Sequence, residues 1–251
     1  MGDAVILAGG KAPRKLAPKA RYEACLTIGG EPMILHVVRA LIDAPSTNRI
    51  FILGPTDILT QIPFPERVTI AEGAESMADL LRIALRLPQA DEPFLLSAAD
   101  IPLLKPSAVE YLWQSGAREH ADLAYPIVRK KQIRSAYPHA HRTYVHLADG
   151  TFTGGNILYV GGGVSEDLLA FAERIFEARK HPWQIASLFG LKFCLAFLLR
   201  RLTVSDIEQH LSALWTRRCH ALIMPSPEIA MDVDKPSDWQ LINEYMTQTT
   251  S

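Results

Sequence analysis

The N-terminal part of the chain alternates between two hydrophobic patterns. Short apolar runs bounded by glycine, proline or acidic residues are typical of buried strands, and they occupy residues 4–8, 26–28, 50–53, 68–70 and 94–98. Between them, apolar residues recur at helical i, i+3, i+4 and i+7 spacing, as in Ile34, Val37, Val38 and Leu41 or in Met77, Leu80, Leu81 and Ala84. Strands that alternate with helices predict βαβ units and a mostly parallel sheet.

The C-terminal part has a different pattern. Residues 122–128 and 142–147 indicate strands, and an Asp149-Gly150 turn leads into Thr151-Phe152. A helical region is expected over about 165–214, with one apolar stripe formed by Leu168, Leu169, Ala172, Ile175 and Phe176. A strand at 220–224 and a terminal helix complete the chain. We expect an α/β fold in a single domain over residues 1–251: a Rossmann-like, mostly parallel mixed sheet flanked by helices, with a C-terminal helical insertion at 161–219.

Charge and cysteine content narrow the classes of function. The chain has 251 residues and a formal net charge of −1 at pH 7, so it lacks the positive surface that nucleic acids or anionic membranes attract. Cys25, Cys194 and Cys219 are widely spaced and follow no metal-ligand pattern. Because a signal peptide is also not recognisable, we expect reduced thiols and a cytoplasmic location.

One apolar stretch, residues 183–199, raises the question of a membrane segment. Gly190 and Lys192 interrupt it, and it is shorter than the roughly 20 residues of a spanning helix. We therefore expect no stable membrane insertion. The stretch is interpreted as a buried helix, as a homodimer contact or as a lid over an apolar acceptor.

A pair of glycines marks the first candidate site. Gly9 and Gly10 follow the first apolar run, and Lys11 and Arg14 come next. Glycines let backbone N–H groups approach a ligand closely, and such a turn with nearby cations can hold phosphate oxygens. An ordinary turn is the alternative. In open α/β sheets, ligands bind at the carboxyl ends of the strands, where this turn is expected.

Three aspartates are candidate metal ligands. Asp100 ends the strand run in Ser97-Ala98-Ala99-Asp100, and Asp232 and Asp234 lie in the later Asp232-Val233-Asp234 segment. Mg²⁺ is normally held by one or two carboxylates together with substrate phosphates. A helix cap or a loop carboxylate is the alternative for Asp100. In extended chain, Asp232 and Asp234 point to opposite faces, so we expect only one of them to meet Asp100.

Four motifs in order carry a family resemblance. They are Leu7-Ala8-Gly9-Gly10-Lys11-x-x-Arg14, Gly30-x-Pro32-Met33-Ile34-x-His36, Ala99-Asp100-Ile101-Pro102-Leu103-Leu104 and Asp232-Val233-Asp234-x-Pro236-x-Asp238. The series resembles the MobA-like nucleotidyltransferases, related to molybdenum cofactor guanylyltransferase and to sugar-phosphate uridylyl- and cytidylyltransferases. The resemblance covers about residues 3–160 and 220–246. It implies a GT-A-like nucleotide-diphospho-sugar transferase fold and a Mg²⁺-dependent enzyme that joins an NTP to a phosphorylated small-molecule acceptor, releasing pyrophosphate.

The resemblance also implies site residues. Lys11 and Arg14 would neutralise the departing pyrophosphate, Asp100 would bind the metal and act in catalysis, and Asp232 or Asp234 would be the later metal ligand. The implied nucleotide-binding set is Leu7, Ala8, Gly9, Gly10, Lys11, Glu72, Gly73, Ser76 and Asp100. The implied acceptor loop contains Thr153, Gly155 and Asn156. For Asn156, a turn residue with positive φ is the alternative.

Two departures from the family pattern affect the expected phosphate site. Glu23 occupies the position where these enzymes usually have a second lysine, and a carboxylate cannot neutralise phosphate. Ala12-Pro13 replaces the usual small polar residues, and Pro13 has no N–H to donate. Lys15, Lys19 or Arg21 would then have to supply the missing charge.

Other interpretations remain beside this one. A nucleotide-sugar glycosyltransferase would need an Asp-x-Asp where this chain has Ala98-Ala99-Asp100, and Glu23 motivates a non-catalytic nucleotide-binding module. His139, His141 and His146 suggest either a zinc site or, as favoured by the missing acidic and cysteine ligands, an exposed hairpin. The basic run that begins at Arg129-Lys130-Lys131 is interpreted as a solvated face or as a clamp for the acceptor's phosphate.

Overall fold

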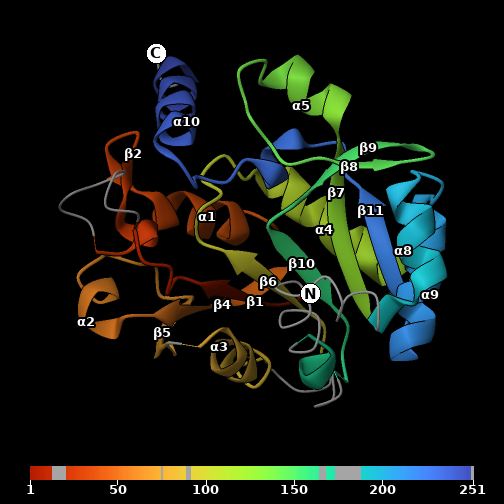
Figure 1. Cartoon of the computed structure of the whole chain (residues 1–251). Coiled ribbons are helices and arrows are strands. Elements are labelled where there is room, and N and C mark those ends of the chain that lie inside the picture. Colours follow the sequence, from red (N-terminus) through yellow and green to blue (C-terminus); the bar gives the residue numbers. More distant parts are fainter. Residues whose placement is uncertain (13–20, 75, 89–91, 164–167, 173–187, 250–251) are drawn as a thin grey trace.

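A mixed β-sheet with helices on both faces forms the centre of the molecule (Figure 1). The computed structural model describes residues 1–12, 21–74, 76–88, 92–163, 168–172 and 188–249. Four parallel strands make up the N-terminal part of the sheet in the order β5-β4-β1-β6. They are β1 (Gly2–Leu7), β4 (Thr47–Gly54), β5 (Val68–Glu72) and β6 (Phe94–Ala98). Each corresponds to a predicted apolar run.

The C-terminal part of the sheet is mixed. It comprises β7 (Leu123–Arg129), β8 (Val145–Leu147), β9 (Gly150–Gly154), β10 (Ile157–Val160) and β11 (Cys219–Ile223). Strand β10 runs antiparallel to both β6 and β7, while β11 pairs with β7 in parallel. A separate antiparallel pair, β2 (Thr27–Ile28) with β3 (Glu31–Pro32), follows the short helix η1 (Glu23–Cys25). The expected α/β class with a mixed sheet is confirmed.

The two faces of the sheet pack against different helices because alternate side chains point to opposite faces. Ile6, Ile52 and Leu95 pack with α1 (Met33–Ile42) and α4 (Pro106–Arg118). Val5, Leu53 and Leu96 pack with α3 (Met77–Ala84), with helical residues 168–172 and with Trp215 of α9. The remaining helices are α2 (Thr56–Leu59), α5 (Lys130–Ala136), α8 (Leu191–Leu198), α9 (Val204–Trp215), η2 (Pro227–Ala230) and α10 (Pro236–Thr249).

The helical insertion is broken rather than continuous. Gly190 precedes α8 with φ of 83°, and Arg200 follows α8 with φ of 55°, so the chain leaves the helical conformation at both positions. Helix α9 then begins anew, with the hydroxyl of Thr203 accepting the N–H of Asp206 at 3.1 Å. Ile175 and Phe176 of the expected stripe lie outside the described residues. Within the described part of the chain, no helix is sufficiently long and apolar to cross a membrane.

The segment between β7 and β9 also differs from expectation. A helix, α5, occupies residues predicted only as a basic run, and the strand predicted at 142–147 is reduced to β8 at its end. Gln132 explains the helix, because its side chain accepts the N–H of Arg129 at 3.1 Å and donates to the carbonyl of Met224 at 3.0 Å. The position of α5 is therefore fixed by a contact with the chain after β11.

Candidate active site

The glycine loop lies at the carboxyl edge of the sheet. It follows β1, which pairs in parallel with β4 and β6, so the three strands end side by side. The loop is held by backbone hydrogen bonds: the N–H of Glu23 donates to Gly10 at 3.0 Å and that of Ala12 donates to Arg21 at 3.1 Å. These bonds fix residues 10–12 against residues 21–23.

A cavity of about 680 Å³ opens beside this loop. Gly9, Gly10 and Lys11 line it from the loop, and Glu72, Gly73 and Ser76 line it from the segment after β5. The structure thus brings together the predicted nucleotide-binding residues from two segments distant in sequence. Its volume lies in the 300–1,000 Å³ range of small-molecule sites.

The other described residues predicted to bind the nucleotide do not line this cavity. Leu7 lines a neighbouring cavity of about 480 Å³. The side chain of Ala8 is buried, and its N–H donates to the carbonyl of Leu53 at 2.7 Å. Asp100 stands beyond the end of β6, next to Val233. Arg14 lies outside the described residues.

The wall formed after β5 is held by local contacts. The carboxylate of Glu72 accepts hydrogen bonds from the hydroxyl and the N–H of Thr56 at the start of α2. A Cβ added to Gly73 would lie 3.1 Å from backbone atoms of Gly54, so the two turns pack closely. Ser76 caps α3, since its Oγ accepts the N–H of Asp79 at 3.0 Å. This wall is therefore rigidly connected to β4 and β5.

Arg21 and Glu23 define the charge around the loop. Of the three cations suggested in place of a second lysine, Arg21 lines the cavity, where its guanidinium lies 5.5 Å from the centre of the Tyr22 ring. Lys15 and Lys19 lie outside the described residues. Glu23 stands over the loop, because a Cβ added to Gly10 would lie 2.5 Å from its Oε2 atom. Burial, and next the charge of Asp234, raise the pKa of Glu23.

Asp100 is next to the later aspartate segment. The N–H of Val233 donates to the carbonyl of Asp100 at 3.0 Å, which places Asp232 and Asp234 on either side of that contact. The Oδ1 atom of Asp100 is buried and has no hydrogen-bond partner among the described residues. Burial, and then the charges of Asp232, Glu23 and Asp234, raise the pKa of Asp100 to about 7.

The expectation that only one of Asp232 and Asp234 meets Asp100 directly stays a prediction. The charges of both carboxyl groups raise the pKa of Asp100. Burial is the main cause that raises the pKa of Asp234, followed by the contact with Asp232. The alternation rule applies to strands, whereas residues 231–234 are in no strand or helix.

Arg142 is a functional candidate that the sequence did not reveal. Its side chain is only 6 % exposed and forms ion pairs with Asp232 and, at 3.0 Å, with Asp238 of α10. It also donates to the carbonyl of Asp232 at 2.9 Å. No motif contains Arg142, because its partners lie some ninety residues further along the chain. It fixes the position of Asp232.

The donor set fits a hard divalent cation that is completed by its substrate. Within the described ranges, no three or more His, Cys, Asp or Glu side chains are placed so that together they could hold a metal ion. The unpartnered oxygen of Asp100, with one carboxylate of the later aspartate segment, still supplies the one or two oxygen ligands that Mg²⁺ takes from a protein. Substrate phosphates and water normally provide the remaining ligands of such an ion.

The predicted acceptor loop separates β9 from β10. Asn156 faces the aspartates, and its Nδ2 atom donates to Asp232 Oδ1 at 3.1 Å. Its backbone φ is not positive, which excludes the turn alternative. Thr153 and Gly155 line two cavities that flank this loop. A Cβ added to Gly155 would lie 3.0 Å from Pro126, so the loop packs directly on β7.

The three histidines do not form a zinc site with other His, Cys, Asp or Glu side chains of the described residues. His139 and His141 lie in the segment between α5 and β8, while His146 is on β8, where its ring contacts the hydroxyl of Thr151 at 3.1 Å. All three side chains are exposed. Two of them precede the strand because β8 begins only at Val145.

Comparisons with known proteins agree with this geometry. The family model of the MobA-like NTP transferase domain matches residues 4–224. None of the curated proteins compared with the chain matches it. A solved structure described as a hypothetical transferase from Thermus thermophilus is 30 % identical, with a TM-score of 0.83, over 94 % of this chain and 98 % of that one.

More distant structures share the fold. The 2-C-methyl-D-erythritol 4-phosphate cytidylyltransferase of Francisella tularensis is 13 % identical with a TM-score of 0.60, covering 97 % of this chain and 99 % of that chain. A CMP:2-keto-3-deoxy-manno-octonic acid synthetase, solved in complex with CTP, is 16 % identical with a TM-score of 0.59. That match covers 99 % of this chain and all of the synthetase chain.

Proposed function

Because the chain belongs to the family of MobA-like NTP transferase domains and is a nucleotidyltransferase, we propose that it joins an NTP to a phosphorylated small molecule and releases pyrophosphate. One observation carries this proposal. The backbone contact between Val233 and Asp100 brings the segment that holds Asp232 and Asp234 next to Asp100. They lie at the edge of the sheet that also bears the cavity lined by the glycine loop.

Different residues would bind different parts of the nucleoside triphosphate. Backbone N–H groups around Gly9 and Gly10 can approach phosphate oxygens closely, since neither residue has a side chain. Lys11 and Arg21 line the same cavity and supply positive charge for the phosphates that leave. Arg14 would add to this charge, as the family resemblance implies. Glu72, Gly73 and Ser76 border the cavity on the side assigned to the nucleobase.

The aspartates form the proposed Mg²⁺ site. Asp100 with Asp232 or Asp234 would hold the ion, which when bound offsets the negative charge of the phosphates. Arg142 and Asn156 both hydrogen-bond Asp232 Oδ1 and so keep its carboxylate oriented. The otherwise repelling carboxylates are thereby maintained in one arrangement.

The proposed reaction is an in-line displacement at phosphorus. An oxygen of the acceptor's phosphate attacks the α-phosphorus of the NTP, and a new O–P bond forms. The bond from the α-phosphorus to the bridging oxygen of pyrophosphate breaks, and pyrophosphate leaves. The protein's part is to position both substrates and to stabilise the charge on the departing group with Lys11 and Arg21.

A pyrophosphate-release assay tests this proposal. The protein is incubated with each NTP, Mg²⁺ and a panel of phosphorylated acceptors, and pyrophosphate is followed over time. We expect release that depends on both substrates and falls at least a hundredfold in Asp100→Asn, a change of about 2.7 kcal/mol in activation free energy. The matched control is Asp43→Asn, at the exposed C-terminal end of α1, which should retain wild-type activity.

Other outcomes would support different functions. Release of a nucleoside diphosphate from a nucleotide sugar, with no pyrophosphate from any NTP, would instead identify a glycosyltransferase. Equal activity of Asp100→Asn and wild type would contradict the assignment of the aspartate site.

A further inference from the structure

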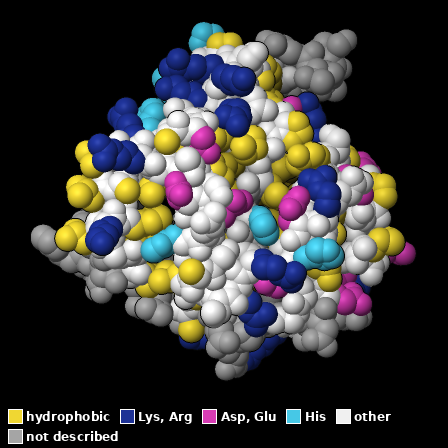
Figure 2. Space-filling view, turned by 90° about the vertical axis from the view of Figure 1, so that its right-hand side faces the viewer, with side chains coloured by type: hydrophobic (Ala, Val, Ile, Leu, Met, Phe, Trp, Pro, Cys, Tyr) yellow, Lys and Arg dark blue, Asp and Glu magenta, His cyan; other side chains and the backbone are white. Residues whose placement is uncertain are grey.

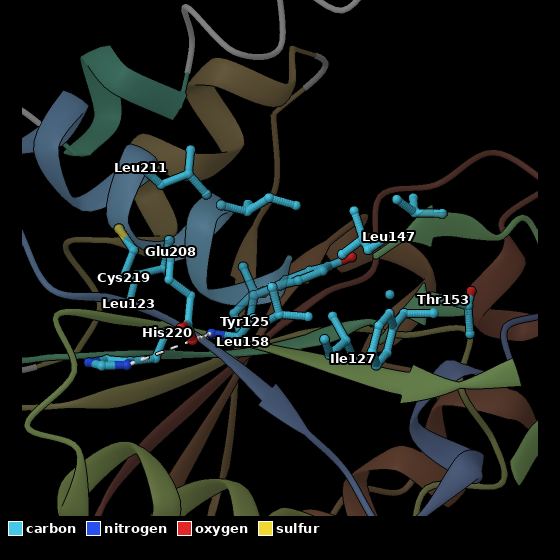
Figure 3. A pocket seen from close by; sticks show the side chains of 16 residues that line it. Leu123, Tyr125, Ile127, Leu147, Thr153, Leu158, Glu208, Leu211, Cys219 and His220 are labelled. Atoms are coloured by element: carbon cyan, nitrogen blue, oxygen red, sulfur yellow. Dashed lines mark hydrogen bonds and ion pairs between the residues drawn. The ribbon is translucent and has the colours of Figure 1, made fainter. Parts of the chain in front are cut away.

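Two apolar cavities lie on the sheet face that packs against α3 and α9. One, of about 390 Å³, lies between the sheet and α9, and Figure 3 shows the side chains around it. The other, of about 480 Å³, is the cavity lined by Leu7. Tyr125 of β7 and Leu158 of β10 line both cavities. We refer to the two together as the apolar groove.

The groove begins at the proposed reaction centre. Its larger cavity is lined by Ala98, two residues before Asp100, and by Asn156, which hydrogen-bonds Asp232. Its smaller cavity is lined by Thr153 of the same loop. The groove therefore runs from the acceptor loop, past Tyr125 and Leu158, toward α9.

The lining of the groove does not suit a sugar phosphate. The cavity beside the glycine loop presents Lys11, Arg21 and Glu72, whereas the groove presents leucine, isoleucine, valine and aromatic side chains. Sugar hydroxyl groups buried there would lose hydrogen bonds to water without replacement, which is unfavourable. Hydrocarbon gains free energy on entering such a surface, at about 0.8 kcal/mol per buried methylene.

The charged side chains of the groove are already paired. Among the described lining residues, only Glu208 and His220 are acidic or basic, and His220 Nδ1 lies 3.9 Å from Glu208 Oε1. Glu208 Oε1 also accepts the N–H of Ala221 at 2.7 Å. Figure 3 shows this pair at the end of the cavity away from Thr153. The side-chain amide of Asn156, which can donate to a phosphate, lies at the end near the aspartates.

We propose that the phosphorylated acceptor is an amphiphile whose apolar chain occupies this groove. Its phosphate lies beside Asn156, where an oxygen attacks the α-phosphorus of the NTP as the bond to pyrophosphate breaks. Its chain extends past Tyr125 and Leu158 toward α9. This inference rests on the proposed function, because it names the acceptor class of the same site.

The helix before α9 is consistent with an acceptor drawn from a lipid surface. Phe193 of α8 stacks on His210 of α9 with ring centres 4.2 Å apart, so α8 lies beside the helix that covers the groove. Leu191 and Leu198 of α8 are 77 % and 75 % exposed. Figure 2 views the side that carries these helices and shows hydrophobic side chains gathered between charged ones.

A series of alkyl phosphates tests the inference. Butyl, hexyl, octyl and decyl phosphate are offered with Mg²⁺ and the NTP that turns over best, and pyrophosphate release is measured. We expect kcat/KM to rise by up to about fourfold for each added methylene, the factor equivalent to about 0.8 kcal/mol, until the groove is full. A series without dependence on chain length, or lower activity than with sugar phosphates, would overturn the proposal.

A substitution that fills part of the groove tests where the apolar chain of the acceptor lies. Ala221 lines the smaller cavity on β11, so Ala221→Phe should shorten the best chain by several methylenes and leave butyl phosphate unaffected. The control is Ala117→Phe, at an exposed position on α4. If Ala221→Phe reduces folded yield, Leu211→Phe on α9 gives the same test from the opposite wall. An unchanged chain-length optimum in folded variants would overturn the proposal.

Separate measurements distinguish failure of the inference from failure of the proposed function. Pyrophosphate release with sugar phosphates alone would leave the nucleotidyl transfer standing and overturn the amphiphile. No release with any acceptor would overturn both. Two forms of acceptor show whether the protein takes it from a lipid bilayer or from water. They are phosphatidylcholine vesicles that contain phosphatidic acid, and dispersed decyl phosphate. Turnover with either supports the inference, and turnover with neither overturns it.

Discussion

At the residue scale, burial, and then the charges of Asp232, Glu23 and Asp234, raise the pKa of the Asp100 carboxyl group to about 7. The same group in the unfolded chain titrates near its ordinary pKa of about 3.9. The folded protein therefore binds this proton more tightly, so the contribution of Asp100 to stability is complete at low pH. It is lost as the pH rises from about 4 to 7. At 1.36 kcal/mol per pKa unit, the loss reaches at most about 4 kcal/mol.

The first prediction concerns this pH dependence. Without metal or nucleotide, Asp100→Asn should unfold at higher urea concentration than the wild type, because the repelling charge is removed. The difference in free energy of unfolding should grow between pH 5 and pH 7 and change little above pH 8. Urea titrations at four pH values measure it. A constant difference across this range would contradict the assigned pKa.

Arg142 gives a second prediction at this scale. Arg142→Met leaves Asp232 and Asp238 without their buried cationic partner, and the loss of one member of a buried pair typically costs about 3–5 kcal/mol. Calorimetry should therefore show a strongly reduced melting temperature. The control is Arg39→Met, whose ion pair with Glu31 is about half exposed and whose loss should cost less than about 1 kcal/mol. Equal effects of the two substitutions would refute the positioning role.

At the element scale, α4 packs directly on β10. A Cβ added to Gly116 in α4 would lie 2.5–2.7 Å from three ring atoms of Tyr159. Alanine normally stabilises a helix by about 1 kcal/mol relative to glycine, whereas overpacking a core costs about 1–3 kcal/mol. The cost of overpacking should exceed the gain in helix propensity, because the Tyr159 ring is buried.

The third prediction is that Gly116→Ala lowers the free energy of unfolding by about 1–2 kcal/mol. In the background Tyr159→Val, which removes the ring, the same substitution should be neutral or stabilising. A double-mutant cycle by urea denaturation measures the coupling between the two sites. Additive effects would show that the clash is not the cause.

The hydrophobic pattern within each element explains which helices and strands the sequence predicts. Strands β1, β4 and β6 and helices α1 and α3 were predictable because each presents apolar residues with the period of its structure. Helix α5 was not, since Ile133 is its only buried described residue and its position depends on Gln132 contacting the carbonyl of Met224. The break at Gly190 was visible as a glycine, but the turn at Arg200, after the end of α8, was not.

The residues of the candidate site likewise divide into those that a sequence pattern marks and those that it does not. Gly9, Gly10, Glu72 and Asp100 were found from motifs at strand ends, where the fold itself brings residues together. Arg142 was missed because a single arginine in a loop carries no periodic signal.

At the scale of the whole molecule, binding of an NTP and binding of Mg²⁺ should be strongly coupled. Phosphates placed near Asp100, Asp232, Asp234 and Glu23 are repelled unless a cation lies between them, and coupling between two ligands is reciprocal. Each ligand alone should therefore bind weakly.

The fourth prediction follows from this coupling. At about one hundred times the dissociation constant, the pair should stabilise the fold by about 2.7 kcal/mol, a rise of roughly 5–10 °C in melting temperature for a protein of this size. Thermal scans with the NTP, with Mg²⁺ and with both measure it. Asp100→Asn serves as the control and should lose the synergy. An NTP shift of the same size with and without Mg²⁺ would contradict the model.

The contact between Val233 and Asp100 has a consequence for the protein during its synthesis. Ribosomes add about 5–20 residues per second, so roughly ten seconds separate the appearance of Asp100 from that of Asp232. During that interval the nascent chain can build the parallel strands and the glycine loop, but Asp232 and Asp234 of the proposed metal site do not yet exist. An unfinished copy therefore has no competent centre with which to consume nucleotide. Activity begins only when translation has delivered the last part of the chain.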